Sequence, residues 1–145
     1  MNTKPLLTPF YLIAATLIGL ADTLYLSYNH FLNAIPTCAI GGCEVVLTHP
    51  SATLYSLHVP LAYLGLIYYL YLLCLAALLA WEPRSKALRT AVLAYTGLGL
   101  LCSIAFELFQ YFVIHALCIY CGISAATTLV LFCLAVWHFK STRSK

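Results

Sequence analysis

Residues 115–121 read His-Ala-Leu-Cys-Ile-Tyr-Cys, and this stretch lies where a long apolar run must change direction. From about Leu88 to Phe139 the chain is almost continuously apolar. As a single helix this run would be about 78 Å long, more than two hydrocarbon thicknesses of ~30 Å. The run therefore predicts two membrane-spanning helices, at about 88–113 and 117–139, that turn back near His115.

The same stretch contains a C-x-x-C pair, Cys118 and Cys121. Two cysteines at this spacing lie on one helical turn and can form a disulfide or hold two thiolates. A helix N-terminus, where we place Cys118, favours the thiolate, which is the nucleophile in thiol–disulfide exchange. The motif alone does not identify the site, because zinc sites and redox sites share it.

Composition predicts an all-α integral membrane protein. The chain has 145 residues, so we expect one domain over 1–145. It is 63% hydrophobic and 8% charged, whereas soluble proteins carry about 25% charged residues. Seven basic and four acidic residues are too few and too scattered for a nucleic-acid-binding surface.

Two further apolar runs, at about 9–30 and 59–81, complete a predicted four-transmembrane-helix bundle. A signal peptide is the competing interpretation of the first run. We favour a retained span, because the run is long, lacks an A-x-A-like cleavage site and carries Asp22.

The stretch 29–58 is the only long connection, and its prolines and Gly41-Gly42 pair are typical of a loop. Apolar residues follow Glu44, so we expect a short helix from about that point, lying on the bundle and interrupted near Pro50. The loop also carries the C-x4-C pair Cys38 and Cys43, with glycines that permit a tight turn.

Basic residues indicate the orientation. The chain has seven basic residues, and the long loop and the 113–117 turn contain none of them. In the four-span arrangement all seven lie on one side of the membrane: Lys4, Arg84, Lys86, Arg89, Lys140, Arg143 and Lys145. By the positive-inside rule, both termini are expected in the cytoplasm. Both cysteine pairs then face the extracytoplasmic side, which supports disulfides.

Two cysteine pairs at one membrane face predict an electron relay. A thiol of another protein can reduce the Cys38–Cys43 pair through a mixed disulfide, and a loop thiolate can then attack the Cys118–Cys121 pair. The second pair must then lose two electrons. Its place at the bundle mouth favours a lipid-soluble acceptor, and a quinone fits best, since no G-x-G-x-x-G or C-x-x-C-H motif is present.

The other three cysteines, Cys74, Cys102 and Cys133, fall inside apolar spans. Buried cysteine acts as a small hydrophobe, so we expect these three to be packed within the helices without a redox role.

The motif set resembles the vitamin K epoxide reductase family, and its prokaryotic members in particular. The matching stretches are Cys38-x4-Cys43-Glu-Val-Val-Leu-Thr-His-Pro, Pro60-Leu-Ala-Tyr-Leu-Gly65 and Cys118-Ile-Tyr-Cys121, within the four-span pattern. The resemblance implies a four-helix bundle around a quinone and a thioredoxin-fold (DsbA-like) partner. It also implies a disulfide-forming oxidase in a bacterial plasma (inner) membrane that passes electrons to ubiquinone or menaquinone.

Carried over by motif, the resemblance makes Cys38 and Cys43 the shuttle pair. Cys43 would attack Cys118, and Cys121 would be the thiolate beside the quinone. No thioredoxin-like domain is present in the sequence, so the partner is expected to be a separate chain.

The sequence departs from the family at quinone-contacting positions. A Ser or Thr six residues after the second loop cysteine is replaced by His49, which we take as a candidate to bind a quinone oxygen or relay a proton. The positions of a quinone-binding Asn and Tyr in animal members are Leu61 and Ala125 here. These losses favour a general quinone-linked oxidase over vitamin K epoxide reduction.

Several other polar residues have two readings. Asp22 and Glu107 lie inside spans. One interpretation is that they transfer protons for quinone reduction, and the other is that they only form hydrogen bonds within the bundle. We favour the second interpretation, because both residues lie near the outer ends of their spans. His115 steadies the Cys118 thiolate or caps the turn. The four tyrosines of the second span are candidates for the quinone pocket or for packing: Tyr63, Tyr68, Tyr69 and Tyr71.

Other functions compete with the oxidase. The four edge cysteines have spacings that zinc accepts, so a non-enzymatic protein with a four-cysteine zinc site is one alternative, although the oxidase reading assigns no metal. Disulfides that only staple the loops of a tetraspan protein are another. The reverse electron flow, a quinone or epoxide reductase driven by partner thiols, would use the same cysteines.

Overall fold

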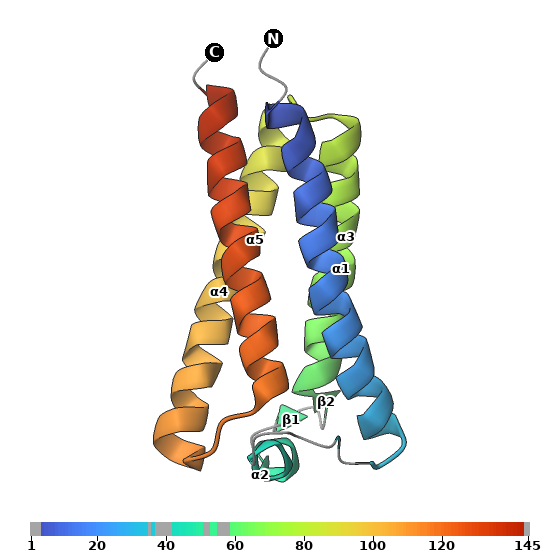
Figure 1. The fold of residues 1–145 in the computed structure, drawn as a ribbon, viewed down its shortest axis with the longest axis vertical. Helices are drawn as coiled ribbons and strands as arrows, with labels where there is room; N and C mark the ends of the chain where they lie inside the picture. The colour runs from blue at the N-terminus through green and yellow to red at the C-terminus, as the bar shows by residue number, and fades with distance from the viewer. Residues whose placement is uncertain (1–3, 35, 37–41, 51–52, 55–58, 144–145) are drawn as a thin grey trace.

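The computed structural model describes residues 4–34, 36, 42–50, 53–54 and 59–143. Four long helices, α1 (Lys4–Phe31), α3 (Leu61–Trp81), α4 (Lys86–Phe109) and α5 (Ile119–Arg143), stand side by side (Figure 1). Each contains a segment long and apolar enough to cross a membrane. The predicted all-α four-helix bundle is therefore confirmed, and the chain is a multi-pass membrane protein.

The reversal predicted near His115 is confirmed. After Phe109 the helix widens into a π-helix, η2 (Gln110–Ile114). His115 ends it in the left-handed conformation, with φ 56°, and its backbone N–H donates to the Gln110 carbonyl. The chain then turns, and α5 begins at Ile119, slightly later than predicted.

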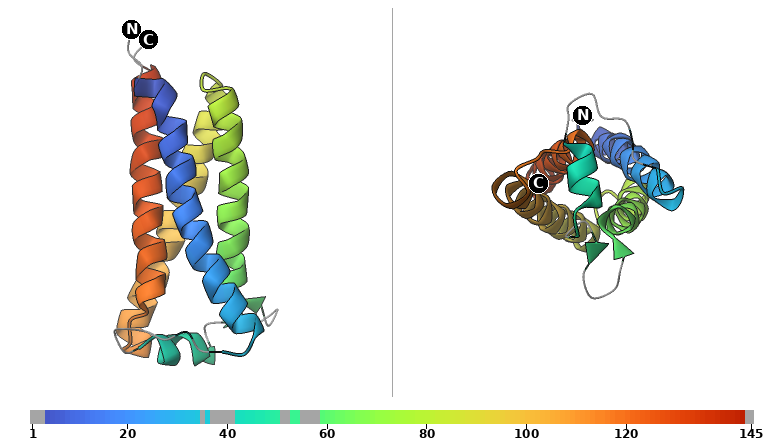
Figure 2. Two further views of the ribbon diagram at one scale, coloured as in Figure 1. Left: turned by 45° about the vertical axis from the view of Figure 1, so that its right-hand side comes forward. Right: turned by 90° about the horizontal axis from the view of Figure 1, so that it is seen from below.

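The described part of the connection between α1 and α3 includes a helix that covers one end of the bundle. The predicted short helix is confirmed as α2 (Cys43–Thr48), which lies across the bundle end (Figures 1 and 2). Two short strands that the sequence did not predict follow it, β1 (Thr53–Leu54) and β2 (Val59–Pro60), paired antiparallel. Cys38 and His58 lie outside the described residues.

A packed core fills the other end of the bundle, where α1 begins and α5 ends (Figure 1). Its buried residues come from all four long helices: Leu12, Tyr69, Leu72, Leu75, Ala76, Leu79, Val92, Leu131 and Ala135. Tyr69 closes this core toward the middle of the bundle. Its ring lies against Gly19 of α1, where any side chain would collide with it.

The Tyr69 hydroxyl also ties α3 to α5. It lies 3.0 Å from the Ser124 carbonyl oxygen and 3.1 Å from the hydroxyl oxygens of both Ser124 and Thr128. A buried hydroxyl needs such partners, because an unpaired polar group loses its hydration without compensation. The bonds hold the two helices in register next to Cys121, one turn before Ser124.

The expectation that Cys74, Cys102 and Cys133 are buried is wrong, because all three are exposed on the bundle. The outer face of a membrane bundle meets lipid, which is as apolar as a protein core. An apolar neighbourhood in the sequence therefore does not separate a residue that faces lipid from one that faces another helix.

Candidate functional site

Cys43 begins α2 in a fully buried position. Its side chain is 0% exposed and is disulfide-bonded. The preceding Gly42 has φ 133°, and a side chain there would lie 2.7 Å from the Leu117 carbonyl oxygen. Only glycine combines this backbone conformation with such close contact, so Gly42 lets α2 begin directly against the turn that carries the C-x-x-C pair.

Cys43 packs with Cys118 in one buried cluster, to which Val46 also belongs. Ile114 and Tyr120 are among the partly buried residues that pack against this cluster. The structure thus brings one loop cysteine to one cysteine of the C-x-x-C pair, although the two are 75 positions apart in the sequence and share no local motif. Cys38, the other loop cysteine, lies outside the described residues.

Cys118 lies at the start of α5, as its spacing predicted. Its carbonyl oxygen accepts a 3.0 Å hydrogen bond from the Gly122 N–H, the first of the helix. Its own N–H donates to Gln110 Oε1 at 3.0 Å. Cys118 and Cys121 are both free thiols, and Cys118 is 2% exposed.

The Cys118 thiol lies between the spanning segments, and its surroundings favour the thiolate. A hydrogen bond with the Cys121 side chain lowers the pKa of Cys118 to about 7, against the opposing effect of burial. The backbone N–H groups of Cys121 and Tyr120 act in the same lowering direction, as expected at a helix N-terminus. The Asp22 carboxylate opposes them through its negative charge.

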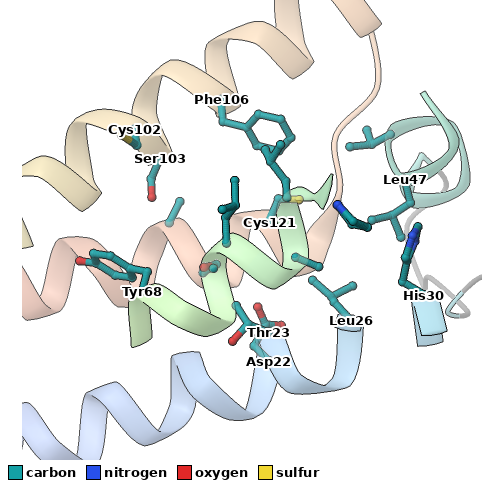
Figure 3. A pocket seen from close by; sticks show the side chains of 18 of the residues that line it. Asp22, Thr23, Leu26, His30, Leu47, Tyr68, Cys102, Ser103, Phe106 and Cys121 are labelled. Carbon is teal, nitrogen blue, oxygen red and sulfur yellow. The ribbon is translucent and has the colours of Figure 1, made fainter. Parts of the chain in front are cut away.

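A cavity of about 940 Å³ runs from α2 into the bundle, with Cys121 in its wall. Figure 3 shows the Cys121 sulfur between Phe106 of α4 and the Asp22–Thr23 turn of α1. Leu47 and His30 lie at the α2 end of the cavity, and Tyr68 lies at the opposite end (Figure 3). The walls are mostly apolar, which is typical of small-molecule sites.

All four residues considered for quinone contact line this one cavity: Cys121, His49, Leu61 and Ala125. They come from α5, from the end of α2 and from the start of α3. Tyr68 and Tyr69 line it too, whereas Tyr71 is exposed on the bundle. Their common location agrees with a shared role, and binding by these residues stays a prediction.

Asp22 and Glu107 also line the cavity, from α1 and α4. The Asp22 Oδ2 and the Tyr68 hydroxyl are buried without a hydrogen-bond partner among the described residues. Unpaired polar atoms in a cavity wall are costly for the protein alone and are available to a ligand. This placement goes against the reading of Asp22 as only a bundle hydrogen-bonding residue.

Two of the histidines considered for the site, His115 and His30, lie in different places: one at the turn and one at the cavity. His115 is exposed and caps η2, which fits the capping reading of that residue. His30 lies at the cavity edge, with its ring edge-on to Tyr63 at a centroid distance of 6.0 Å.

No three His, Cys, Asp or Glu side chains gather as metal ligands in the part of the chain that the structure describes. Cys43 is disulfide-bonded, and zinc binds the thiolate form of cysteine. A zinc site of four cysteine thiolates would therefore require a different redox state of this residue.

Sequence reasoning missed Gln110. It is 0% exposed, begins the π-helix and binds the Cys118 N–H through its side chain. The available signal was one neutral amide in an otherwise apolar stretch just before the turn.

The model of the Vitamin K epoxide reductase family matches residues 10–136, which is most of the chain. No curated protein matches the sequence.

Proposed function

The chain belongs to the vitamin K epoxide reductase family, and from that premise we propose that it is a quinone-linked thiol oxidase that reoxidises a thioredoxin-fold partner. Family membership makes it a membrane oxidoreductase. The partner, the acceptor and the direction of electron flow are part of the proposal.

One observation carries the proposal. Cys43 and Cys118 share a buried cluster, while Cys121, three residues further along the same helix start, lines the cavity. The C-x-x-C pair therefore has one cysteine toward the loop and one toward a site large enough for a lipid-soluble ring. A stapling role for the cysteines would not need this division.

The relay has two exchange steps that balance. A partner dithiol reduces the Cys38–Cys43 disulfide and is itself oxidised. The Cys43 thiolate then attacks the Cys118 sulfur of the Cys118–Cys121 disulfide, so that a Cys43–Cys118 bond forms and the electron pair leaves on Cys121. Attack of Cys38 on Cys43 restores the loop disulfide and releases the Cys118 thiolate.

The low pKa of Cys118 assists the final attack of Cys38 on Cys43, in which the Cys118 thiolate is released, since a thiol of low pKa is a better leaving group. The structure has Cys43 disulfide-bonded and Cys118 and Cys121 as free thiols. This combination corresponds to the proposed state in which the inner pair holds the electrons.

The cavity fits a quinone ring as acceptor. Its volume of about 940 Å³ is of the size that binds such molecules. The ring would lie beside Cys121 and Ala125, with Leu61 and His49 on the loop side. Tyr68 can donate a hydrogen bond to a carbonyl oxygen, because its hydroxyl has no partner among the described residues. A bound quinone supplies an acceptor for two electrons and two protons.

We propose an orientation with both termini in the cytoplasm. α1 begins and α5 ends at the end of the bundle where α3 meets α4 (Figure 1). Arg84, Lys86 and Lys140 lie at that end, and α2 with Cys43 lies at the other. The positive-inside rule then assigns the cysteines to the oxidising side of a plasma membrane.

The test is quinone reduction by the purified protein in detergent, with a reduced thioredoxin-fold protein as donor. Ubiquinone and menaquinone analogues are compared, and Cys121→Ala is run beside the unaltered chain. Rapid quinone reduction that is lost in Cys121→Ala supports the oxidase and its electron exit. A folded, unaltered chain that reduces neither quinone contradicts the proposal, as does full turnover by Cys121→Ala.

A further inference from the structure

Gln110 is a fully buried amide of which only half is used. Its Oε1 accepts the hydrogen bond from the Cys118 N–H at 3.0 Å. Its Nε2, also buried, has no hydrogen-bond partner among the described residues. A buried donor without an acceptor is destabilising, and such exceptions often coincide with functional sites.

The position of Gln110 joins both sides of the α4–α5 turn. Its backbone carbonyl accepts from the His115 N–H and from the Ala116 N–H, the latter at 3.4 Å. Its side chain reaches past this turn to the first residue of the C-x-x-C pair. The π-helix that begins at Gln110 gives the chain the extra width for this connection, and π-helical turns are common at functional sites.

The side chain of Gln110 lies near enough to Cys121 to act on its sulfur, although no hydrogen bond joins Nε2 to that sulfur in this structure. The other groups that act on the Cys121 sulfur are the Cys118 thiol and the negative charge of Glu107 on α4. Asp22 of α1 adds negative charge near Cys118. The charged groups that face the pair are thus both acidic, and Gln110 supplies a neutral N–H donor among them.

We propose that Gln110 is a positioning residue that fixes Cys118 through Oε1 and stabilises the departing Cys121 thiolate through Nε2. The inference rests on the proposed relay. When Cys43 attacks Cys118, the Cys118–Cys121 bond breaks and the electron pair remains on the Cys121 sulfur. A hydrogen bond to that charged sulfur favours the step, because charge-assisted hydrogen bonds are stronger than neutral ones.

An isomer equilibrium measures this effect without quinone or partner. In a Cys38→Ser chain with Cys74, Cys102 and Cys133 changed to Ala, one equivalent of oxidant leaves a single disulfide. The protein then interconverts between a Cys118–Cys121 disulfide and a Cys43–Cys118 disulfide with Cys121 free. Acid quenching, alkylation and peptide mass analysis give the ratio of the two forms.

Two substitutions of Gln110 distinguish its two proposed roles, which are to fix Cys118 through Oε1 and to stabilise the Cys121 thiolate through Nε2. Gln110→Glu keeps an oxygen for the Cys118 N–H and removes the Nε2 donor, whereas Gln110→Met removes both. We expect both to shift the ratio toward the Cys118–Cys121 disulfide, by about 10- to 100-fold, the effect of one hydrogen bond to a charged group. Retained helix content by circular dichroism shows that each variant is folded.

The charge introduced by Gln110→Glu needs its own control. Glu107→Gln removes one negative charge near Cys121 and leaves the Gln110 donor in place. It is expected to shift the ratio in the opposite direction, toward free Cys121, and by less than the Gln110→Met shift. A shift by Glu107→Gln as large as that of Gln110→Met would overturn the hydrogen-bond explanation.

The outcomes also separate this inference from the oxidase itself. An unchanged ratio in Gln110→Glu with a shift only in Gln110→Met would show a purely structural amide and overturn the inference. The Cys38→Ser chain that keeps Gln110 is the reference for these ratios. If this chain forms no Cys43–Cys118 disulfide at all, the result contradicts the proposed order of the relay instead.

Discussion

The two ends of the bundle are built differently. At the end where α1 begins, four helices pack into a core with side chains such as Leu79 and Leu131 at 0% exposure. At the α2 end, the same helices enclose a cavity whose wall holds an unpaired Asp22 oxygen and the Cys121 sulfur. Stability is therefore concentrated at one end, and reactive and unpaired polar groups are concentrated at the other.

This difference indicates how a small membrane protein can hold a reactive site. Polar groups without partners destabilise the fold, so they are tolerated where the rest of the structure is tightly packed. Tyr69 lies at the boundary, with its ring in the core and its hydroxyl bound to Ser124 and Thr128 near the cavity. If the two ends are functionally distinct, substitutions at each should change different measurements.

The largest effect is expected from Cys118→Ala, which removes the sulfur that receives electrons from Cys43. Donor-dependent quinone reduction should fall to background, a loss of about 1,000-fold or more, because no covalent route then joins the pairs. The loop pair should still form mixed disulfides with the donor protein, detected by non-reducing electrophoresis. Turnover above one hundredth of the unaltered rate would show another route for the electrons.

Gly42→Ala should have the next largest effect, because the added carbon meets the Leu117 carbonyl at 2.7 Å in a backbone conformation that alanine avoids. α2 must move, and with it Cys43. We expect donor-dependent turnover to fall about 10- to 100-fold, since displacement of about 1 Å between reacting groups has such effects.

Gly122→Ala is the matched control for this change. An added carbon at Gly122 meets no atom within 4 Å, although Gly122 directly follows Cys121. Turnover should therefore be nearly unchanged. Equal losses in both variants would mean that any change near the cysteines is harmful and that the contact of α2 with the turn is not special.

The ionisation of the Cys118 thiol as a function of pH tests whether the α2 end of the bundle favours the thiolate. Hydrogen bonding from Cys121 lowers the Cys118 pKa to about 7, from an ordinary 9.0, so the reduced protein should form this thiolate with a midpoint near pH 7. Below the midpoint the thiolate fraction falls about tenfold per pH unit. The measurement is thiolate ultraviolet absorbance, taken as the difference from a Cys118→Ser chain.

Cys121→Ala should move that midpoint upward, since it removes the largest cause of the shift. A midpoint near 9 in the unaltered chain would mean that neither the Cys121 side chain nor the helix start lowers the pKa of the Cys118 thiol. In that case the argument that Cys118 is a good leaving group when Cys38 attacks Cys43 would lose its support.

Much of this arrangement followed from the sequence, because the strongest signals were physical limits. An apolar run too long for one crossing had to turn near His115, and it does so at η2. The apolar residues after Glu44 predicted a short helix, which is α2. Length, hydrophobicity and charge act locally along the chain and are therefore readable from it.

Features that depend on contacts between distant segments were not readable. No local pattern showed that the Gln110 amide would bind the Cys118 N–H, or that Asp22 would lie in the cavity wall. Lipid-facing and buried cysteines also occur in equally apolar stretches of sequence. This explains why Cys74 and Cys133 were wrongly predicted to be buried. The contact of Cys43 with Cys118 required the resemblance to the family.

At the packed end, Leu131→Ala should lower stability and leave chemistry unchanged. Leu131 is 0% exposed, and its truncation leaves a cavity, which we expect to cost about 1–2 kcal/mol because membrane helices gain from packing more than from transfer out of water. The checks are the apparent melting temperature in detergent and turnover at low temperature. Leu129→Ala, on the same helix but 50% exposed, is the control and should melt like the unaltered chain.

The smallest effect is expected from changing Cys74, Cys102 and Cys133 to Ala together. All three are exposed on the bundle and have no assigned part in the relay, although Cys102 also reaches the cavity wall. Turnover should stay within about twofold of the unaltered chain, and the melting temperature should stay within a few degrees of it. The reason is that surface substitutions away from special contacts change stability little. If turnover falls while the protein stays folded, reverting Cys102 alone tests the one span thiol that touches the cavity. Rescue by that reversion would extend the reactive end of the bundle deeper than the C-x-x-C pair and would move the boundary between the two ends toward the middle of α4.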